Sequence, residues 1–163
     1  MNENVLKWVG AGVLGLLAVV GIVVFMQRGA RLEMTGQVLK VRTAPITDTY
    51  AIAVLDFRAM DVSDVPAVVR NVTVYEEDQN GVRTAGKTIS EPDAKRVFDA
   101  IPLLGPKYNK SLVYRDRIPE RGSLDRMIAA TFQTPAAALD QRKRFVITIE
   151  EIDGGIFEID EKK

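Results

Sequence analysis

The stretch from Trp8 to Met26 contains no charged residue and is almost wholly apolar. A helix over this stretch would span roughly 28 Å, close to the ~30 Å hydrocarbon core of a bilayer. We therefore expect a short tail over residues 1–7 and an uncleaved transmembrane helix over residues 8–27. Cleavage as a signal peptide is not expected, because Arg28 stands where the second small residue of a cleavage site would stand.

The charges beside the apolar segment leave its orientation open. Lys7 precedes it and is opposed by Glu3, whereas Arg28 and Arg31 come after it. The positive-inside rule therefore favours a cytoplasmic C-terminal domain. The very short tail before the helix favours export instead. We expect an extracytoplasmic domain on a bacterial cytoplasmic membrane, against the local charges.

Small residues lie on one face of the expected helix. Ala11, Gly15 and Ala18 share this face by the 3.6-residue period, and such a face lets two helices approach closely. A homodimer through the helix is one interpretation. The simpler one is that glycine and alanine are common in membrane helices without any pairing.

Composition limits the chemistry available to the rest of the chain. Residues 28–31 are expected to be a linker, residues 32–160 one domain and residues 161–163 a charged tail. The chain has 22 basic and 22 acidic residues, so its net charge gives no reason to expect a nucleic-acid partner. It has no histidine and no cysteine, which excludes a Ser-His pair, a cysteine nucleophile and ordinary zinc, copper or haem ligation. We expect no catalytic residues, no cofactor and no metal.

Alternating apolar residues separated by tight turns predict an antiparallel β-sandwich. In the second of the expected strands, Leu55 and Phe57 are predicted to face the core. Asn80-Gly81 is predicted to form a hairpin turn with positive φ at both residues. The flanking residues imitate the start of a calcium-binding EF-hand loop, but Lys87 stands where the bidentate glutamate should be. The expected strands are residues 32–42, 50–60, 68–77, 82–89, 112–115, 124–132, 145–152 and 156–159.

Two short helical insertions are expected, so the predicted fold is mainly β. Ser90 is a suitable N-cap for a helix with Pro92 in its first turn and one apolar face. Its apolar residues are Ala94, Val97, Phe98 and Ile101. A second helix is predicted from Pro135 to about Arg142, with Thr134 as its cap.

The segment from Leu55 to Gly81 carries a resemblance. A strand that ends in Asp56-Phe57-Arg58, a polar break, a second strand at Val72–Tyr75 and a turn succeed one another. This order resembles the immunoglobulin-like sandwich domains of the FxLYD and late-embryogenesis-abundant type 2 groups. Lys40 stands where those domains often carry asparagine, and residues 90–117 have no counterpart. The resemblance implies a sandwich, often membrane-tethered and extracytoplasmic in bacteria, and no catalytic residues.

Three surface segments are candidate contacts. Leu103 and Leu104, with Tyr108 nearby, either pack into the core or form an exposed apolar contact for a partner. Arg115 and Arg117 lie in the basic segment 107–126, which is either an ion-paired solvated face or a patch for an anionic partner. The acidic C-terminal hairpin is expected to serve solubility and to protect a sheet edge, or else to dock a basic partner.

These observations predict a membrane-anchored, non-catalytic binding or scaffolding module of a bacterial envelope, with a bilayer around residues 8–27 and an unidentified protein partner. The alternative is a β-sandwich that binds a lipid or small molecule in a cavity between its sheets. An enzyme that uses carboxylates is a third hypothesis, but no pair of acids can be named for it.

Overall fold

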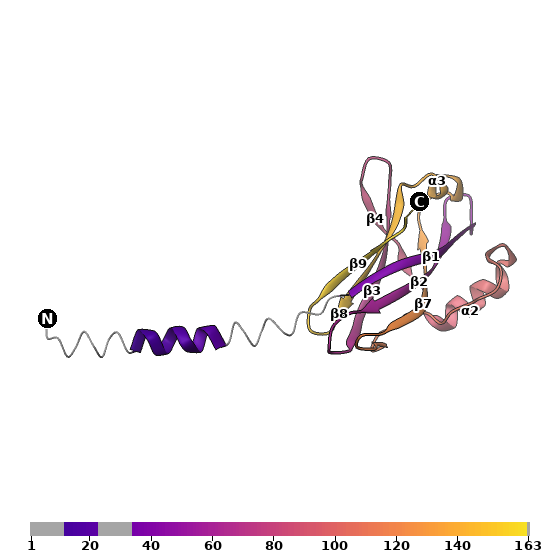
Figure 1. The fold of residues 1–163 in the computed structure, drawn as a ribbon. Helices are drawn as coiled ribbons and strands as arrows, with labels where there is room; N and C mark the ends of the chain where they lie inside the picture. Colours follow the sequence, from indigo (N-terminus) through magenta and orange to yellow (C-terminus); the bar gives the residue numbers. More distant parts are fainter. Residues whose placement is uncertain (1–11, 23–33, 163) are drawn as a thin grey trace, which may run out of the picture. The chain divides into compact units, whose positions relative to one another are not determined.

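The computed structural model describes residues 12–22 and 34–162. Contacts divide the chain into two units, residues 1–31 and 32–163, which are described separately. In the first unit, residues 12–22 are helical (Figure 1). The other parts of the expected transmembrane segment, residues 8–11 and 23–27, lie outside the described residues. Within the described ranges, no helix is long and apolar enough to cross a membrane.

The second unit is mainly β and contains two antiparallel sheets (Figure 1). The first sheet has the order β1 (Met34–Pro45), β2 (Ala51–Asp61), β7 (Ser123–Phe132) and β5 (Lys87–Thr88). The second has the order β4 (Arg83–Ala85), β3 (Ala67–Glu77), β8 (Arg144–Glu151) and β9 (Ile156–Asp160), and β6 (Arg117–Ile118) also pairs with β3. The predicted C-terminal hairpin is confirmed as the β8–β9 pair.

The core fills the space between the inner faces of the two sheets. Phe57 of β2, Phe132 of β7 and Phe145 of β8 are fully buried in it, and the last two rings lie 5.6 Å apart between centroids. Leu55 and Phe57 face this core as predicted. Their placement follows from the two-residue period of a strand, which sends alternate side chains to the same face.

A second, smaller apolar layer covers the outer face of the first sheet. It is formed by α2 (Glu91–Ala100) and the 3-10 turn η1 (Pro102–Leu104), which pack on β2 and β7. Ile52 and Val54 of β2 are therefore buried on the side opposite Phe57. The sequence predicts one buried face for this strand, whereas the structure buries both.

The expected single strand over residues 82–89 is wrong, because the chain changes sheets within it. β4 pairs with β3, and β5 pairs with β7 in the other sheet. The change occurs at Gly86, whose N–H donates to the Val74 oxygen at 2.8 Å. A Cβ at this position would lie 2.5 Å from Cζ of Phe132. Glycine is required here because the backbone passes directly over a core ring.

Three other local predictions need correction. Residues 112–115 form no strand, and Asp116 N–H instead closes a turn by donating to the Val113 oxygen at 3.0 Å. In the predicted hairpin turn only Gly81 takes a positive φ, of 83°. Thr134 is not the cap of α3 (Ala136–Asp140), which begins after Pro135 without a side-chain cap. For α2 the predicted cap is confirmed, since the Ser90 side chain accepts from Asp93 N–H.

Candidate partner-binding site

Arg42 of β1 holds the segment after α2 against the first sheet. Its side chain is 9% exposed, and Nη2 donates to Asp56 Oδ2 at 2.6 Å. Nη1 donates to the main-chain oxygens of Leu104 at 2.7 Å and Pro106 at 2.8 Å. Because one guanidinium joins two strands and two carbonyls, a buried charge fixes the main chain where η1 ends, from Leu104 to Pro106.

Aromatic rings and an amide enclose this ion pair. The Arg42 guanidinium carbon lies 5.1 Å from the Phe98 ring and 5.2 Å from the Tyr108 ring. Asn109 Nδ2 donates to the second oxygen of Asp56 at 2.9 Å. The Lys40 ammonium lies 4.9 Å from the Tyr108 ring as well, so Tyr108, a predicted partner contact, is engaged by two cations of β1, although 58% of the residue remains exposed.

A second ion pair closes the loop after η1. Lys107 Nζ donates to the Glu91 carboxylate, and Ser111 N–H donates to Glu91 Oε2 at 2.7 Å. Burial raises the pKa of Glu91, but the hydrogen bonds from Lys107 and Ser111 outweigh it and lower this pKa to about 2. The loop is thus attached at both ends, to β1 by Arg42 and to the start of α2 by Lys107.

An apolar groove opens on the surface beside this attached loop. We call it the α2 groove; its volume is about 700 Å³, and it lies between α2, η1 and the β1–β2 turn. Leu103 and Ile46 stand at its rim with 72% and 45% of their surface exposed, whereas Leu104 is buried at 1%. The two predicted leucines therefore have different roles. The groove is lined by Pro45, Ile46, Arg96, Val97, Ala100, Ile101, Pro102 and Leu103.

The basic segment 107–126 separates into paired and unpaired cations. Lys110, Arg115 and Arg117 have no carboxylate partner in the part of the chain that the structure describes. Arg115 instead lies 5.2 Å from the Tyr114 ring, with a positive φ of 66°. The paired cations are Lys107 with Glu91, Arg121 with Asp64 and Arg126 with Asp116.

The acidic C-terminal hairpin is engaged with the chain's own cations. Glu77 of β3 lies at the centre of this network, and hydrogen bonds from Lys143 and Arg144 lower its pKa to about 2. Arg142 also lies just after α3, where its Nη1 donates to the Leu139 oxygen at 3.1 Å. The hairpin pairs are Arg83 with Glu158, Arg142 with Glu161 and Arg144 with Asp160.

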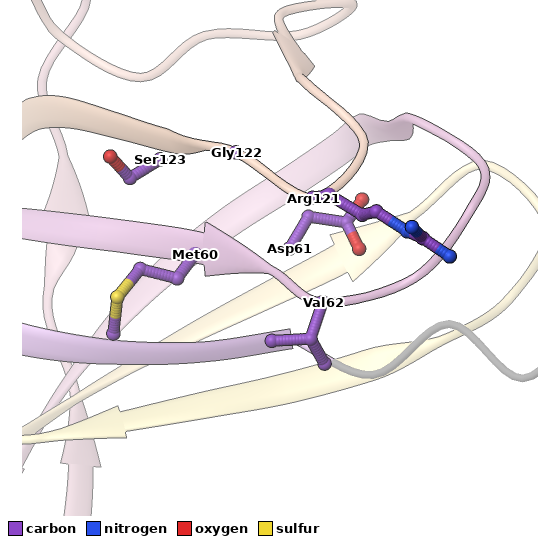
Figure 2. A pocket seen from close by; sticks show the side chains of 6 residues that line it. All are labelled: Met60, Asp61, Val62, Arg121, Gly122 and Ser123. Carbon is purple, nitrogen blue, oxygen red and sulfur yellow. The ribbon is translucent and has the colours of Figure 1, made fainter.

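A second surface pocket lies at the end of the domain where β1 begins. It has a volume of about 580 Å³. Figure 2 shows the side chains of Met60 and Val62 on one side of the β2 end and the Asp61 carboxylate on the other. Asp61 is 1% exposed and accepts from Ser63 N–H at 2.8 Å and from Ala67 N–H at 3.1 Å. Asp-x-Ser is a turn signal that identifies this loop-closing role in the sequence.

The remaining predicted sites concern the membrane helix and bound ions. Gly15 and Ala18 lie in the helix over residues 12–22, and Ala11 lies outside the described residues. A Cβ on Gly15 would have no neighbour within 4 Å. Among the described residues, no group of three or more acidic side chains is placed to hold a metal ion. Helix pairing and the absence of a cofactor both stay predictions.

No family model and no curated protein matches this chain. Among solved structures, it is similar to one described as "X-ray structure of Northeast Structural Genomics Consortium target SoR45". The identity is 11%, the TM-score is 0.35, and the match covers 81% of each chain. A likeness at this level carries no argument about function, so the site has to be interpreted from its own geometry.

Proposed function

We propose that this chain is a membrane-anchored, non-catalytic binding module of a bacterial envelope, and that its α2 groove receives an apolar segment of a protein partner. The observation that carries this proposal is the exposure of Leu103, at 72%, beside a groove lined almost wholly by apolar side chains. Exposed apolar surface that is contiguous and concave is typical of an interaction site.

The loop beside the α2 groove is already fixed in the unbound domain. Arg42 attaches the main chain on both sides of Gly105, and Lys107 attaches the next residues to α2. A surface fixed in this way loses little conformational entropy when a partner binds. Arg96 is the charged residue of the lining; its own pair with Asp93 is exposed on both sides. The expected partner segment therefore carries apolar side chains followed by a carboxylate.

The proposal also includes the transmembrane anchor and an immunoglobulin-like topology of the two sheets. The uncharged stretch over residues 8–27 supports a single transmembrane helix, and the two packed sheets are compatible with an immunoglobulin-like sandwich. We place the domain outside the cytoplasmic membrane. A reporter fused after Lys163 tests this placement, because activity only on the cytoplasmic side would reverse it in favour of the flanking arginines.

Cross-linking in intact membranes tests the groove. A photoreactive residue at Leu103, and separately at Ile46, is expected to capture the same protein. The control is Val82, which is 61% exposed but lies on the β3–β4 turn. Val97→Asp places a charge in the groove and should abolish capture from both positions. Capture that persists in Val97→Asp, or that is equal at Val82, would refute the assignment.

The alternative of a ligand cavity between the sheets finds no supporting observation. The pockets found in the described residues open on the surface, and the space between the sheets holds the rings of Phe57, Phe132 and Phe145. A lipid or small molecule held between the sheets is therefore not part of the proposed function.

A further inference from the structure

Three segments that are distant in sequence meet at the end of the domain where β1 begins. Arg121 N–H donates to the Ser63 oxygen at 3.1 Å, which joins the loop 119–122 to the loop 62–66. Ile152 N–H donates to the Val68 oxygen at 3.0 Å, which joins the β8–β9 turn to the start of β3. We call this surface the β1 end.

The β1 end exposes branched apolar side chains. Val62 and Val65 are 54% and 48% exposed in the loop after β2, and Figure 2 shows Val62 projecting away from Asp61. Ile152 and Ile156 are 44% and 67% exposed in the β8–β9 turn. Single exposed aliphatic residues are ordinary, but these four lie in two loops at the same end of the domain and form a group.

Three arginines that have no carboxylate partner among the described residues lie beside these loops. Arg117 stands opposite Val68 in the β6–β3 pair, and Arg115 N–H donates to the Val69 oxygen at 2.8 Å. Arg70, the next residue of β3, is also exposed. Arg115 has a φ of 66°, a conformation that is costly for a residue with a side chain. The closed turn at residues 113–116 therefore holds this arginine on the surface in a strained conformation.

We propose that the β1 end binds the headgroup layer of an anionic phospholipid bilayer through Arg70, Arg115 and Arg117, with Val62 and Val65 entering the interface. This inference rests on the proposed membrane anchor. If residues 8–27 span the bilayer, seven peptide units connect Gln27 to Met34, and such a chain reaches at most about 25 Å. Basic side chains at that distance are attracted by anionic headgroups, and apolar side chains add interfacial burial.

Acidic residues at the β1 end weaken its attraction to an anionic bilayer. Asp64 is paired with Arg121 at 2.5 Å, whereas Glu120 and Asp153 are exposed and form no salt bridge within the described ranges. Binding therefore depends on the arginines outnumbering these acids, and it should be weak and salt-dependent. Added salt at about 0.5 M shortens the Debye length well below 8 Å and should release the domain.

The test uses the full chain in lipid nanodiscs. Because the chain has no cysteine, Val65→Cys carries a single polarity-sensitive dye at the β1 end, and Asn80→Cys carries it on the β3–β4 turn. With phosphatidylglycerol present, a lipid-borne quencher is expected to quench the dye at position 65 and not at position 80. In purely phosphatidylcholine discs the two positions should differ little.

Charge variants distinguish a contact made by the β1-end arginines from attraction that depends only on the total charge of the domain. Arg115→Asn with Arg117→Gln should lower the ratio of bound to free domain about fivefold for each arginine removed. Asparagine is chosen at position 115 because it tolerates a positive φ. The control, Lys87→Gln with Lys95→Gln, removes the same charge from exposed residues elsewhere and should change nothing.

The two proposals fail in different ways. If the chain does not remain with the nanodiscs, the anchor is wrong. If it remains with them and quenching at position 65 is the same with and without phosphatidylglycerol, the β1-end inference is overturned. Equal losses in the arginine and lysine variants would also overturn it.

Discussion

Replacing Arg42 by methionine removes the cation that joins β1, β2 and the segment after α2, while it keeps much of the apolar side-chain length. Three hydrogen bonds are lost, one to Asp56 and two to the main-chain oxygens of Leu104 and Pro106. The Asp56 side chain is only 5% exposed, and it retains the hydrogen bond from Asn109. The substitution therefore leaves a carboxylate buried without its counter-ion.

Removing one partner of a buried ion pair typically costs about 3–5 kcal/mol, because the other charge remains desolvated. The free energy of unfolding of a domain is only about 5–15 kcal/mol, so Arg42→Met should remove a large part of it. Adding Asp56→Asn eliminates the stranded charge. The double variant should therefore be more stable than Arg42→Met alone, by roughly 1–2 kcal/mol.

Urea unfolding of the full chain in a mild detergent, monitored by circular dichroism, measures these differences. Hydrogen exchange localises them: amides in residues 102–109 should lose protection in Arg42→Met before those of the β2–β7 pair do. A loss below about 1 kcal/mol would show that apolar packing holds the loop without the ion pair. A double variant no more stable than Arg42→Met would also refute the charge argument.

Three further predictions concern Gly86 and two glutamates whose pKa values are shifted. Gly86→Val should destabilise the domain by at least about 1–3 kcal/mol, since its Cβ would lie 2.5 Å from the Phe132 ring; an unchanged urea midpoint would contradict this. The pKa of Glu91 is lowered to about 2, so its ionised form contributes to stability above pH 4.5. This contribution is lost as the pH falls toward 2. Glu91→Gln should therefore flatten the stability–pH curve between pH 4.5 and 2. Burial raises the pKa of Glu151, and the charges of Asp153 and Asp61 raise it further. The free energy of unfolding should therefore fall as the pH rises through that pKa. Glu151→Gln should raise the urea midpoint at pH 7 and not at pH 3.

Features that depend on neighbouring residues are readable in the sequence. The Ser90 cap, the Gly81 turn, the β8–β9 hairpin and the inward placement of Phe57 all arise from local propensity or a two-residue period. The split of residues 82–89 is not readable in this way. The residues on either side of Gly86 are both compatible with a strand, and only the closeness of the Phe132 ring shows why glycine is needed where the chain changes sheets.

The candidate sites illustrate the same division. Leu103 and Leu104 are identical residues in one short apolar run, yet one is 72% exposed and the other 1%. Likewise, sequence spacing predicts an alternating-sign surface over residues 107–126 but does not show which cations are neutralised. The structure makes that separation, because Lys107 meets Glu91 and Arg121 meets Asp64 across loops.

Composition and short-range periodicity are enough to establish three properties of this chain. It carries an uncharged apolar stretch of membrane-spanning length, it lacks histidine and cysteine chemistry, and its domain is mainly β. The burial of β2 on both faces and the attachment of the groove loop by Arg42 depend instead on the folded chain. They arise from contacts such as that between Arg42 and Leu104, which are 62 positions apart, and no local pattern encodes such a pairing.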